Sequence, residues 1–294
     1  MQYPTLTVFT PTYNRAHTLV RTYESLCRQT CKDFEWLIID DGSTDNTEQH
    51  VFSWIAEYKI KIRYIKKSNG GLHTGYTTAI ANIRTELNVC IDSDDFMPDD
   101  AVEKILTLWQ TNNNNNIAGI IGLDFFIGSG PVGGYFSHEG NYHFFEQKYK
   151  LAHNGDTKIV CRTDLMRQFY PIPSFGEKNF NPVWYYIKVG ENHKFMVVNH
   201  NFCFVDYQPD GMGAGIYRQY QNSPKSFAEL RRVYMLSRHL PWYRKFIDAA
   251  HYVSSSIFSK DKNFIQKSPA PVLTIIAIPA GLIIHSLILY KLKK

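Results

Sequence analysis

The sequence predicts an α/β protein with a mostly parallel central sheet flanked by helices, followed by a helical C-terminal tail. Between residues 5 and 123, short apolar runs alternate with segments whose apolar residues recur at helical spacing, which is typical of βαβ units. The length of 294 residues suits one large α/β domain with an appendage, or two domains at most. With 44% hydrophobic and 20% charged residues, the composition indicates a packed core and excludes disordered, collagen-like and disulfide-scaffold proteins.

Local patterns predict the order of the elements. Strands are expected at 5–10, 34–39, 61–65, 88–91 and 117–123, and helices at 15–29, 45–58, 75–87 and 99–110. Pro11 is expected to end the first strand, and Ser43 or Asp45 to cap the second helix. Residues 124–215 are less periodic and richer in glycine and aromatic residues, so we expect sheet additions, loops and a helix that close over a site.

Charge divides the chain into a body and a tail. From Arg218 to the end, 13 Lys/Arg stand against three acids, a net charge of +10, whereas residues 1–217 carry 19 Lys/Arg and 24 Asp/Glu, a net charge of −5. We therefore predict a catalytic domain over 1–217 and a basic, aromatic helical tail over 218–294.

The tail contains an uncharged, apolar segment at 271–290 with basic residues on both sides. Its length is just sufficient to span a bilayer, whereas its internal Pro-Ala-Gly and basic flanks also suit a kinked or interfacial hairpin. A buried core helix is the alternative to membrane association. A basic tail with such a segment indicates an anionic membrane surface as its partner and argues against nucleic acid.

Two features predict a cytoplasmic site of action. Residues 1–6 lack the basic start and apolar run of a secretion signal. The five cysteines, an odd number without zinc-site spacing, are typical of free thiols in a reducing compartment. We expect the protein at the cytoplasmic face of the cell membrane, attached through its tail.

Polar clusters follow three of the predicted strands: Pro11–Arg15, Asp40–Ser43 and Asp92–Asp95. In open α/β sheets, ligands bind beyond the carboxyl ends of the strands. A lone Asp-x-Asp or Asp-Gly-Ser is common by chance, so the joint placement of the three clusters carries the prediction of a ligand site.

The third cluster predicts a metal. On an extended backbone, Asp92 and Asp94 would point to the same face, where two carboxylates repel unless they share a proton or hold a cation. Mg²⁺ or Mn²⁺ bound by one or two carboxylates and phosphate oxygens resolves that repulsion. An acidic loop that caps the following helix is the alternative.

Other chemistries lack their motifs. The eleven histidines show no H-x-x-x-H or H-E-x-x-H spacing, which argues against a zinc enzyme. Neither a GxxxxGK phosphate loop nor a GxSxG hydrolase turn occurs. His73 and His153 lie near the predicted site loops, where a contact with phosphate or metal is a weaker hypothesis.

The ordered set Phe9–Arg15, Ile38–Asp45 and Ile91–Asp95 resembles family 2 glycosyltransferases, which have the GT-A fold. The resemblance covers residues 3–125, and 205–212 is similar to a segment of bacterial surface-polysaccharide assembly members. It implies an inverting transfer of a sugar from a nucleotide diphosphate donor, with Mg²⁺ or Mn²⁺ as cofactor.

The resemblance implies that eight residues bind the nucleotide: Pro11, Thr12, Tyr13, Arg15, Asp40, Asp41, Gly71 and Asp92. Tyr13 offers a stacking face and Arg15 a charge-assisted contact to phosphate. One of the two adjacent aspartates would accept hydrogen bonds from the base, with uracil favoured, and Gly71 would permit close backbone approach. Asp92 would contact ribose and share in metal binding, and Asp94 would ligate the metal that bridges the two phosphates.

An inverting transfer needs a general base near the acceptor hydroxyl. By the same resemblance Glu177 is the first candidate, although Asn181 and Pro182 stand where relatives often carry a second acid. Asp95 and then Asp206 follow, and a structural salt bridge from Glu177 to Lys178 or a nearby arginine is the alternative.

Taken together, these features predict a membrane-attached transferase that uses a UDP-sugar and a saccharide acceptor, the latter lipid-linked because the tail holds the site at an anionic leaflet. Two rivals remain. A nucleotidyltransferase would share the sheet and the metal carboxylates, and a membrane-bound sugar-nucleotide binding protein would share the site without turnover.

Overall fold

The computed structural model describes residues 4–112, 116–206 and 215–293. In these residues eight strands form one sheet, in the order β3-β2-β1-β4-β7-β5-β8-β6. The strands are β1 Leu6–Thr12, β2 Phe34–Asp40, β3 Ile62–Lys66, β4 Leu87–Cys90, β5 Ile117–Phe126, β6 Gly140–Tyr142, β7 Thr157–Arg162 and β8 Lys194–Val205. Four of the seven pairings are parallel, so the predicted α/β class with a mostly parallel central sheet is confirmed.

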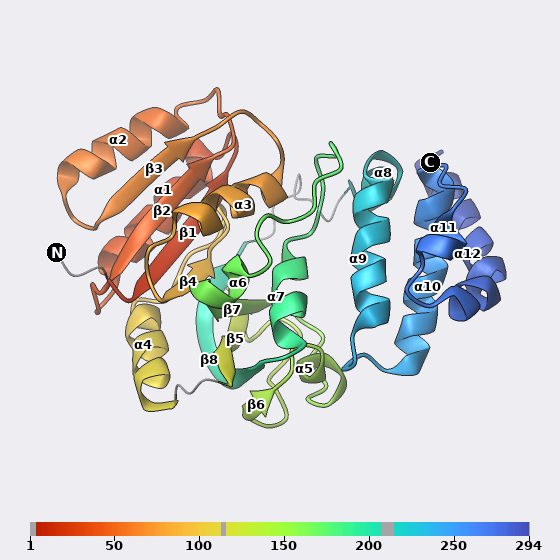
Figure 1. The fold of residues 1–294 in the computed structure, drawn as a ribbon. Coiled ribbons are helices and arrows are strands. Elements are labelled where there is room, and N and C mark those ends of the chain that lie inside the picture. Colours follow the sequence, from red (N-terminus) through yellow and green to blue (C-terminus); the bar gives the residue numbers. More distant parts are fainter. Residues whose placement is uncertain (1–3, 113–115, 207–214, 294) are drawn as a thin grey trace.

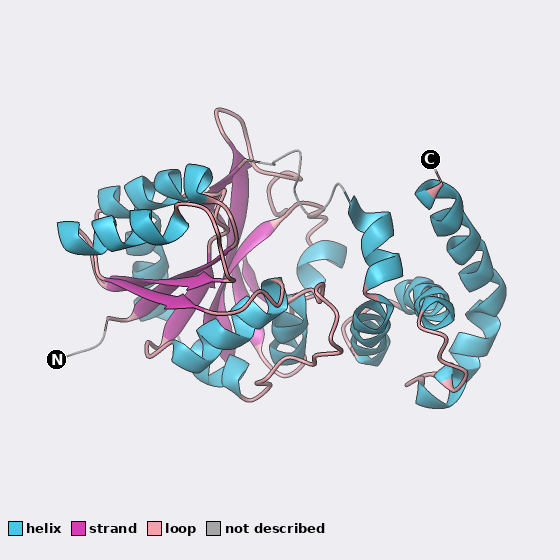
Figure 2. Cartoon of the chain, turned by 90° about the horizontal axis from the view of Figure 1, so that it is seen from above, coloured by secondary structure: helices cyan, strands magenta, loops and turns pink. Residues whose placement is uncertain are grey.

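Helices cover both faces of this sheet, and further helices lie to one side of it (Figures 1 and 2). Those of the body are α1 Ala16–Arg28, α2 Thr47–Glu57, α3 Leu72–Asn82, α4 Ala101–Asn112, α5 Glu146–Tyr149, α6 Thr163–Arg167 and α7 Val183–Gly190. One core lies between the sheet and α1, α2 and α4, and includes Leu19, Trp54 and Trp109. A second core lies under α3, α6 and α7, and includes Ile80 and Tyr185.

The first strand is longer than the sequence predicts. Pro11 lies inside β1 rather than after it. The carbonyl of Phe9 faces β4, where it accepts from Ile91 N at 3.0 Å, and Pro11, two residues on, faces the same way. The β1–β4 pairing ends at Phe9 and Cys90, so no strand lies opposite Pro11 on that side. Proline, which has no backbone N–H to donate, therefore costs the sheet no hydrogen bond at this position.

The helix expected at 75–87 is also displaced, since α3 runs from Leu72 to Asn82. It begins after Gly71, whose φ of +91° no β-carbon-bearing residue adopts easily. It ends where Ile83 becomes extended and leads into β4. Propensity and spacing alone did not locate these two backbone changes.

The second half of the sheet contains the strand additions expected in 124–215. Strand β7 is inserted antiparallel between β4 and β5, although it follows β5 in sequence by 30 residues. Its insertion places Lys158 next to the third acidic cluster, as described below.

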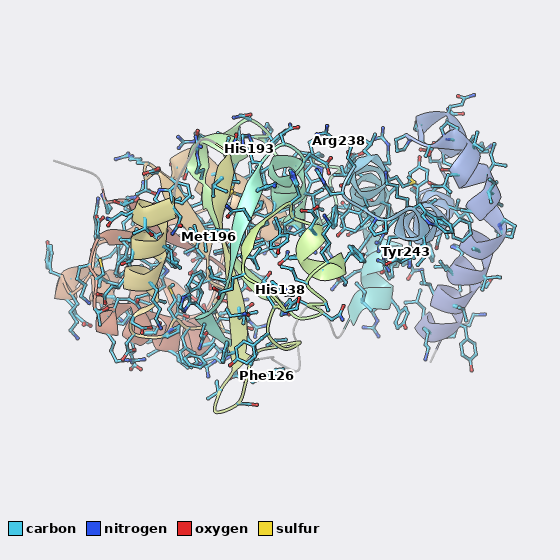
Figure 3. The ribbon with its side chains drawn as sticks, turned by 90° about the horizontal axis from the view of Figure 1, so that it is seen from below. Phe126, His138, His193, Met196, Arg238 and Tyr243 are labelled. Atoms are coloured by element: carbon cyan, nitrogen blue, oxygen red, sulfur yellow. The ribbon has the colours of Figure 1, made fainter. Side chains whose placement is uncertain are left out.

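The C-terminal tail is helical, as predicted, and lies to one side of the sheet (Figures 1 and 3). Its helices are α8 Ile216–Asn222, α9 Pro224–Leu236, α10 Trp242–Phe258, α11 Phe264–Lys267 and α12 Pro271–Leu292. Arg238, labelled in Figure 3, donates to the backbone carbonyl of Glu191 at 2.9 Å, just after α7. Next to it, the rings of His143 and His239 stack 3.7 Å apart, so the tail and the body share a polar and aromatic contact.

Candidate donor site at the ends of the parallel strands

The three predicted clusters meet at the carboxyl ends of β1, β2 and β4. Thr12 pairs with Asp40 across β1 and β2, and Phe9 pairs with Cys90 across β1 and β4. Because these strands are parallel, the loops that follow them lie on one edge of the sheet.

Asn14, which the sequence did not single out, joins the first two loops. Its backbone N–H donates to Ser43 Oγ at 2.9 Å, and its side-chain oxygen accepts from Thr44 N at 2.8 Å. Its φ of +52° lies in the left-handed region that asparagine tolerates. Asp45 accepts from Ala16 N at 3.0 Å and from Thr47 N at 3.1 Å, so it connects the first turns of α1 and α2. The N-cap of α2 is Asn46, so the predicted cap at Ser43 or Asp45 is wrong by at least one residue.

Asp40 is enclosed. Its side chain is fully buried and accepts from Ser43 N at 2.7 Å and from the Tyr64 hydroxyl at 2.5 Å. Burial and the Asp40 carboxylate raise the pKa of Tyr64. Asp40 therefore holds the turn after β2, and its carboxylate is occupied by protein donors.

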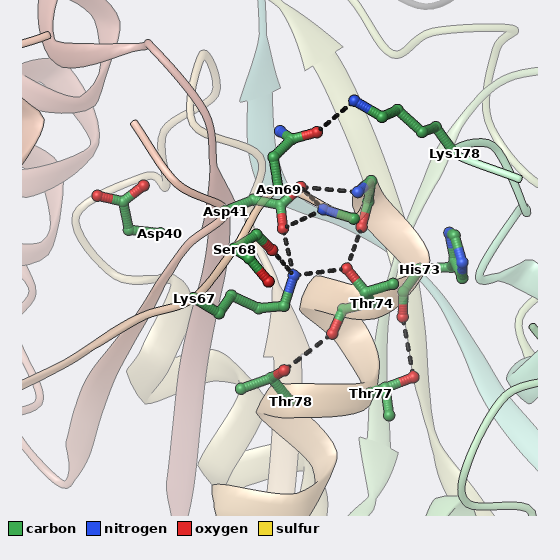
Figure 4. Close-up of polar contacts among 12 residues, drawn as sticks. Asp40, Asp41, Lys67, Ser68, Asn69, His73, Thr74, Thr77, Thr78 and Lys178 are labelled. Carbon is green, nitrogen blue, oxygen red and sulfur yellow. Dashed lines mark hydrogen bonds and ion pairs between the residues drawn. The ribbon is translucent and has the colours of Figure 1, made fainter. Parts of the chain in front are cut away.

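Asp41 organises the segment Lys67–Gly71 (Figure 4). One carboxylate oxygen accepts from Lys67 Nζ and from Gly70 N at 3.0 Å, and the other accepts from Gly71 N at 2.8 Å. Lys67 Nζ also donates to Thr74 Oγ1 at 2.8 Å, at the start of α3. Charge-assisted hydrogen bonds of this kind fix a loop firmly, because the carboxylate is nearly out of water.

Gly71 is required here by a neighbouring chain segment. A β-carbon at this position would lie 1.9 Å from the carbonyl oxygen of Lys178, so no other residue fits. Lys178 Nζ also donates to Asn69 Oδ1 at 3.0 Å (Figure 4). The segment Phe175–Asn179, which we call the strap, thus lies directly on the loop that Asp41 holds.

Residues of the first cluster differ in exposure. Tyr13 is 48% exposed, so its ring is available for stacking, whereas Pro11 is buried. Thr12 is 3% exposed, and its hydroxyl has no hydrogen-bond partner among the described residues. Arg15 is close enough to Asp94 for its positive charge to oppose the rise that burial causes in the pKa of that carboxyl.

The third cluster forms a turn. Asp95 N donates to the Asp92 carbonyl at 3.0 Å, and β4 ends at Cys90. The argument that an extended backbone makes Asp92 and Asp94 converge is therefore wrong. Their charges interact nonetheless: burial, and next the Asp92 charge, raise the pKa of Asp94.

This pair is suited to a hard divalent cation. Asp92 is exposed and Asp94 is half-buried, and their mutual repulsion is the condition that a cation relieves. Among the described residues, no three His, Cys, Asp or Glu side chains gather into a metal site. A site built from two carboxylates and the donor's phosphate oxygens needs no third side chain.

Asp95 faces the interior. It is 6% exposed, and its carboxylate lies 3.4 Å from Lys158 Nζ. Lys158 Nζ also lies 3.8 Å from the carboxylate of Asp124, which is 2% exposed. Burial raises the pKa of Asp95 to about 6 and that of Asp124 to about 7, and the ammonium of Lys158 opposes both shifts.

The carboxylate of Glu177, in the strap, binds the first turn of α9. One oxygen accepts from Lys225 N at 3.0 Å and the other from Ser226 N at 2.7 Å. A carboxylate at this position satisfies two unpaired donors and faces the positive end of the helix. Its role as general base stays a prediction.

The remaining candidates lie apart from the three loops or at their margin. Asp206 Oδ2 accepts from Arg21 at 2.8 Å, and its side chain is 41% exposed. His73 and His153 are buried, which lowers the pKa of both rings. The predicted likeness over 205–212 lies, from residue 207 on, outside the described residues.

The comparisons decide the family. The sequence model of Glycosyl transferase family 2 matches residues 7–169, more than half of the chain. This chain belongs to glycosyltransferase family 2. The match contains the three loops described above, and the resemblance seen in the sequence is confirmed.

Two curated relatives are similar over part of the chain. Poly(ribitol-phosphate) beta-N-acetylglucosaminyltransferase TarP of Staphylococcus aureus (strain N315) is 32% identical over 123 residues, 40% of this chain and 37% of that protein. Chondroitin synthase of Pasteurella multocida (strain Pm70) is 28% identical over 216 residues, 68% of this chain and 20% of that protein. The chain thus spans well under half the length of these relatives.

Solved structures share the fold. S. aureus TarS 1–349 in complex with UDP-GlcNAc superposes with a TM-score of 0.65 at 17% identity, covering 94% of this chain and 80% of that one. Mannosyltransferase PcManGT from Pyrobaculum calidifontis, in complex with GDP-Man and Mn²⁺, superposes with a TM-score of 0.57 at 14% identity, covering 96% and 88%. At these identities the likeness shows the fold, and it agrees with the predicted GT-A class.

Proposed function

We propose that this family 2 member is an inverting glycosyltransferase that moves a sugar from a UDP-sugar to a saccharide acceptor in cell-surface polysaccharide synthesis. The observation that carries the proposal is the meeting at one sheet edge of three loops, which carry an exposed tyrosine, an arginine and a repelling carboxylate pair. The names of the relatives support the donor and the polymer: TarP is an N-acetylglucosaminyltransferase, and a TarS structure contains UDP-GlcNAc.

In this proposal the donor's base stacks on Tyr13 and lies against the loop held by Asp41. Asp41 shapes that loop, and the backbone carbonyl of the buried Asp40 accepts from Lys67 N, where the loop begins. Backbone groups of Lys67–Gly71, rather than the two carboxylates themselves, then face the base. This differs from the direct carboxylate contact that the sequence suggested.

Arg15 and the Asp92–Asp94 pair hold the diphosphate. Asp94 and Asp92 would bind Mg²⁺ or Mn²⁺, and the ion when bound neutralises charge on the departing nucleoside diphosphate. Arg15 supplies a further fixed positive charge next to Asp94. Asp95, which is paired with Lys158 below the turn, positions the pair and does not reach the acceptor.

For the general base we retain Glu177. Its strap lies on the donor loop through the contact between Lys178 and Asn69, whereas Asp95 is enclosed. Each carboxylate oxygen of Glu177 accepts one hydrogen bond from α9 and keeps a second lone pair, which could accept the proton of an acceptor hydroxyl.

The tail attaches the enzyme to the cytoplasmic face of the membrane, next to a lipid-linked acceptor. Within the described residues, one helix is long and apolar enough to cross a bilayer: α12, of 22 residues, in which an 18-residue stretch has a mean hydropathy of 2.4. Its apolar side chains are largely exposed, which argues for a hydrophobic partner.

Purified full-length protein tests the activity. With Mn²⁺ and each of UDP-GlcNAc, UDP-glucose, UDP-galactose and GDP-mannose, we expect one UDP-sugar to bind and to release UDP slowly. Asp94→Ala is expected to lower that release by about 100-fold or more, because it removes a metal ligand at the developing charge. Thr44→Ala, a change in the loop next to the site, is the matched control.

Three outcomes would count against the proposal. If no nucleotide sugar binds, or if Asp94→Ala behaves like the wild type, the assignment of the metal pair is wrong. If the protein instead joins UTP and a sugar 1-phosphate and releases pyrophosphate, the chain is a nucleotidyltransferase. If a UDP-sugar binds tightly but neither hydrolysis nor transfer follows with any saccharide acceptor, it is a binding protein.

A further inference from the structure

Helix α12 has two unlike faces. The inner face packs on α10 through small residues, and Thr274, Ala277 and Gly281 are buried there. A β-carbon at Gly281 would lie 2.6 Å from Val253 Cβ and 2.9 Å from the carbonyl oxygen of Ala250. The two helices are therefore in close contact near the middle of each, and side-chain packing fixes that contact.

The outer face is an exposed apolar stripe. Its residues recur three and four positions apart, which places them along one side of the helix. They are Val272, Ile275, Ile276, Leu282, Ile283, Leu287 and Tyr290, each at least half exposed. In all three whole-molecule views α12 is the outermost helix, at the edge farthest from β3 (Figures 1, 2 and 3). A continuous apolar stripe of this length needs a partner.

Charge around the stripe identifies that partner. No charged residue occurs between Lys267 and Lys291, and exposed Lys262, Lys267, Lys291 and Lys293 flank the stripe at its two ends. The section from residue 218 on carries a net charge of +10. An apolar stripe with lysines at both ends is complementary to a leaflet that contains anionic lipids, because the side chains can enter the acyl region while the lysines contact the headgroups.

The packing of the tail also indicates orientation. If α12 crossed a bilayer, Gly281 would lie near the midplane, and α10 would be carried into the hydrocarbon with it. Asp248 lies two residues from Ala250 and is ion-paired with Arg231 of α9 at 2.7 Å. Ionised side chains at that depth are strongly unfavourable, so the α10–α12 contact is compatible with one leaflet and not with a span.

We propose that α12 lies in the plane of a single anionic leaflet, with its outer stripe inserted and its inner face still packed on α10. Both ends of the helix then stay on the side of the catalytic body. This inference rests on the membrane attachment put forward above, and it is independent of the sugar transferred.

Labelling of engineered cysteines tests it with full-length protein in membranes of expressing cells. Cys27 and Cys31, the two half-buried thiols, are replaced by serine. Lys293→Cys then reports the end of α12, and Glu24→Cys, exposed on α1, reports the catalytic body. In sealed inside-out vesicles, we expect a membrane-impermeant maleimide to label both without detergent, at rates within about threefold of each other.

The possible results separate the claims. If Lys293→Cys is labelled only after detergent while Glu24→Cys is labelled before it, α12 spans the bilayer, and the in-plane proposal is overturned although attachment holds. If the protein stays in the soluble fraction, both the stripe's partner and the attachment are wrong, and a soluble dimer would identify a second copy as that partner. UDP release measured on the same preparations tests the transferase separately.

A second variant tests the stripe itself. Ile283→Glu is expected to lower the membrane-bound fraction at least about tenfold, because a carboxylate at the apolar level of a leaflet is unfavourable. Phe52→Glu, which places the same charge at a 54%-exposed phenylalanine of α2, is the matched control and should leave binding unchanged. Equal binding of the two variants would overturn the proposal.

Discussion

The donor edge and the helical tail both contain buried acids, and they use them differently. At the donor edge, Asp41 binds a lysine and two backbone N–H groups of a loop that faces the site. In the tail, Asp248 is fully buried and pairs with Arg231, so it joins α9 to α10. The first arrangement shapes the proposed donor site, and the second maintains the packing of the tail helices.

Glu177 lies between these two regions, and its substitution is expected to have the largest effect. Glu177→Gln keeps an oxygen that can accept one hydrogen bond from α9, but it cannot take a proton. If Glu177 is the base, kcat falls by about 10²–10⁴, with the thermal midpoint of unfolding nearly unchanged.

Glu177→Ala serves as the comparison for that experiment. It also removes the cap of α9, which costs about 1 kcal/mol of unfolding free energy. If Glu177→Gln retains wild-type kcat while Glu177→Ala is destabilised, Glu177 only caps α9 and is not the base. Asp206→Asn is then the next variant to measure.

Breaking the tail's ion pair comes next in size. Arg231→Met leaves Asp248 buried and uncompensated, so we expect a loss of about 3–5 kcal/mol in urea unfolding. The double variant Arg231→Met/Asp248→Leu should recover most of it. Arg28→Met, whose pair with Asp99 is more than half exposed, should cost less than about 1 kcal/mol. A loss for Arg231→Met no larger than for Arg28→Met would contradict this account.

The smallest expected effect, counted per pH unit, is a pH dependence beneath the donor edge. Burial raises the pKa of Asp124 to about 7, from the ordinary aspartate value of 3.8. Between these values the folded chain keeps a proton that the unfolded chain has lost, so this group makes stability fall as pH rises, by at most about 1.4 kcal/mol per pH unit. Asp124→Asn should flatten the dependence of urea unfolding on pH from 4 to 7. An unchanged slope would show that Asp124 does not keep its proton in the folded chain.

The donor edge was largely predictable from the sequence, because the ends of parallel strands must meet. That rule alone brings the loops after β1, β2 and β4 together. The partners of the predicted acids were not predictable. Lys158 reaches Asp95 only because β7 inserts antiparallel beside β4, and sequence spacing gives no sign of that insertion.

Local geometry was the other source of error. An Asp-x-Asp after a strand suggested an extended backbone, yet the chain turns between Asp92 and Asp95. Lys67 was passed over because a single lysine after a strand has no distinctive pattern, although it completes the contacts of Asp41. The helical character of the tail was easier to predict, and five helices are observed among its described residues.

The strap has a consequence for how activity should be measured. Its Lys178 contacts the donor loop, Glu177 binds the first turn of α9, and Asn179 donates to Gln219 of α8. Removing the chain after residue 217 would therefore remove the second and third of these contacts. The strap, which lies on the donor loop, would then be held less firmly. Weak turnover by such a shortened chain could result from a changed active site as well as from lost membrane attachment. Donor binding by the shortened chain must therefore be measured together with its turnover.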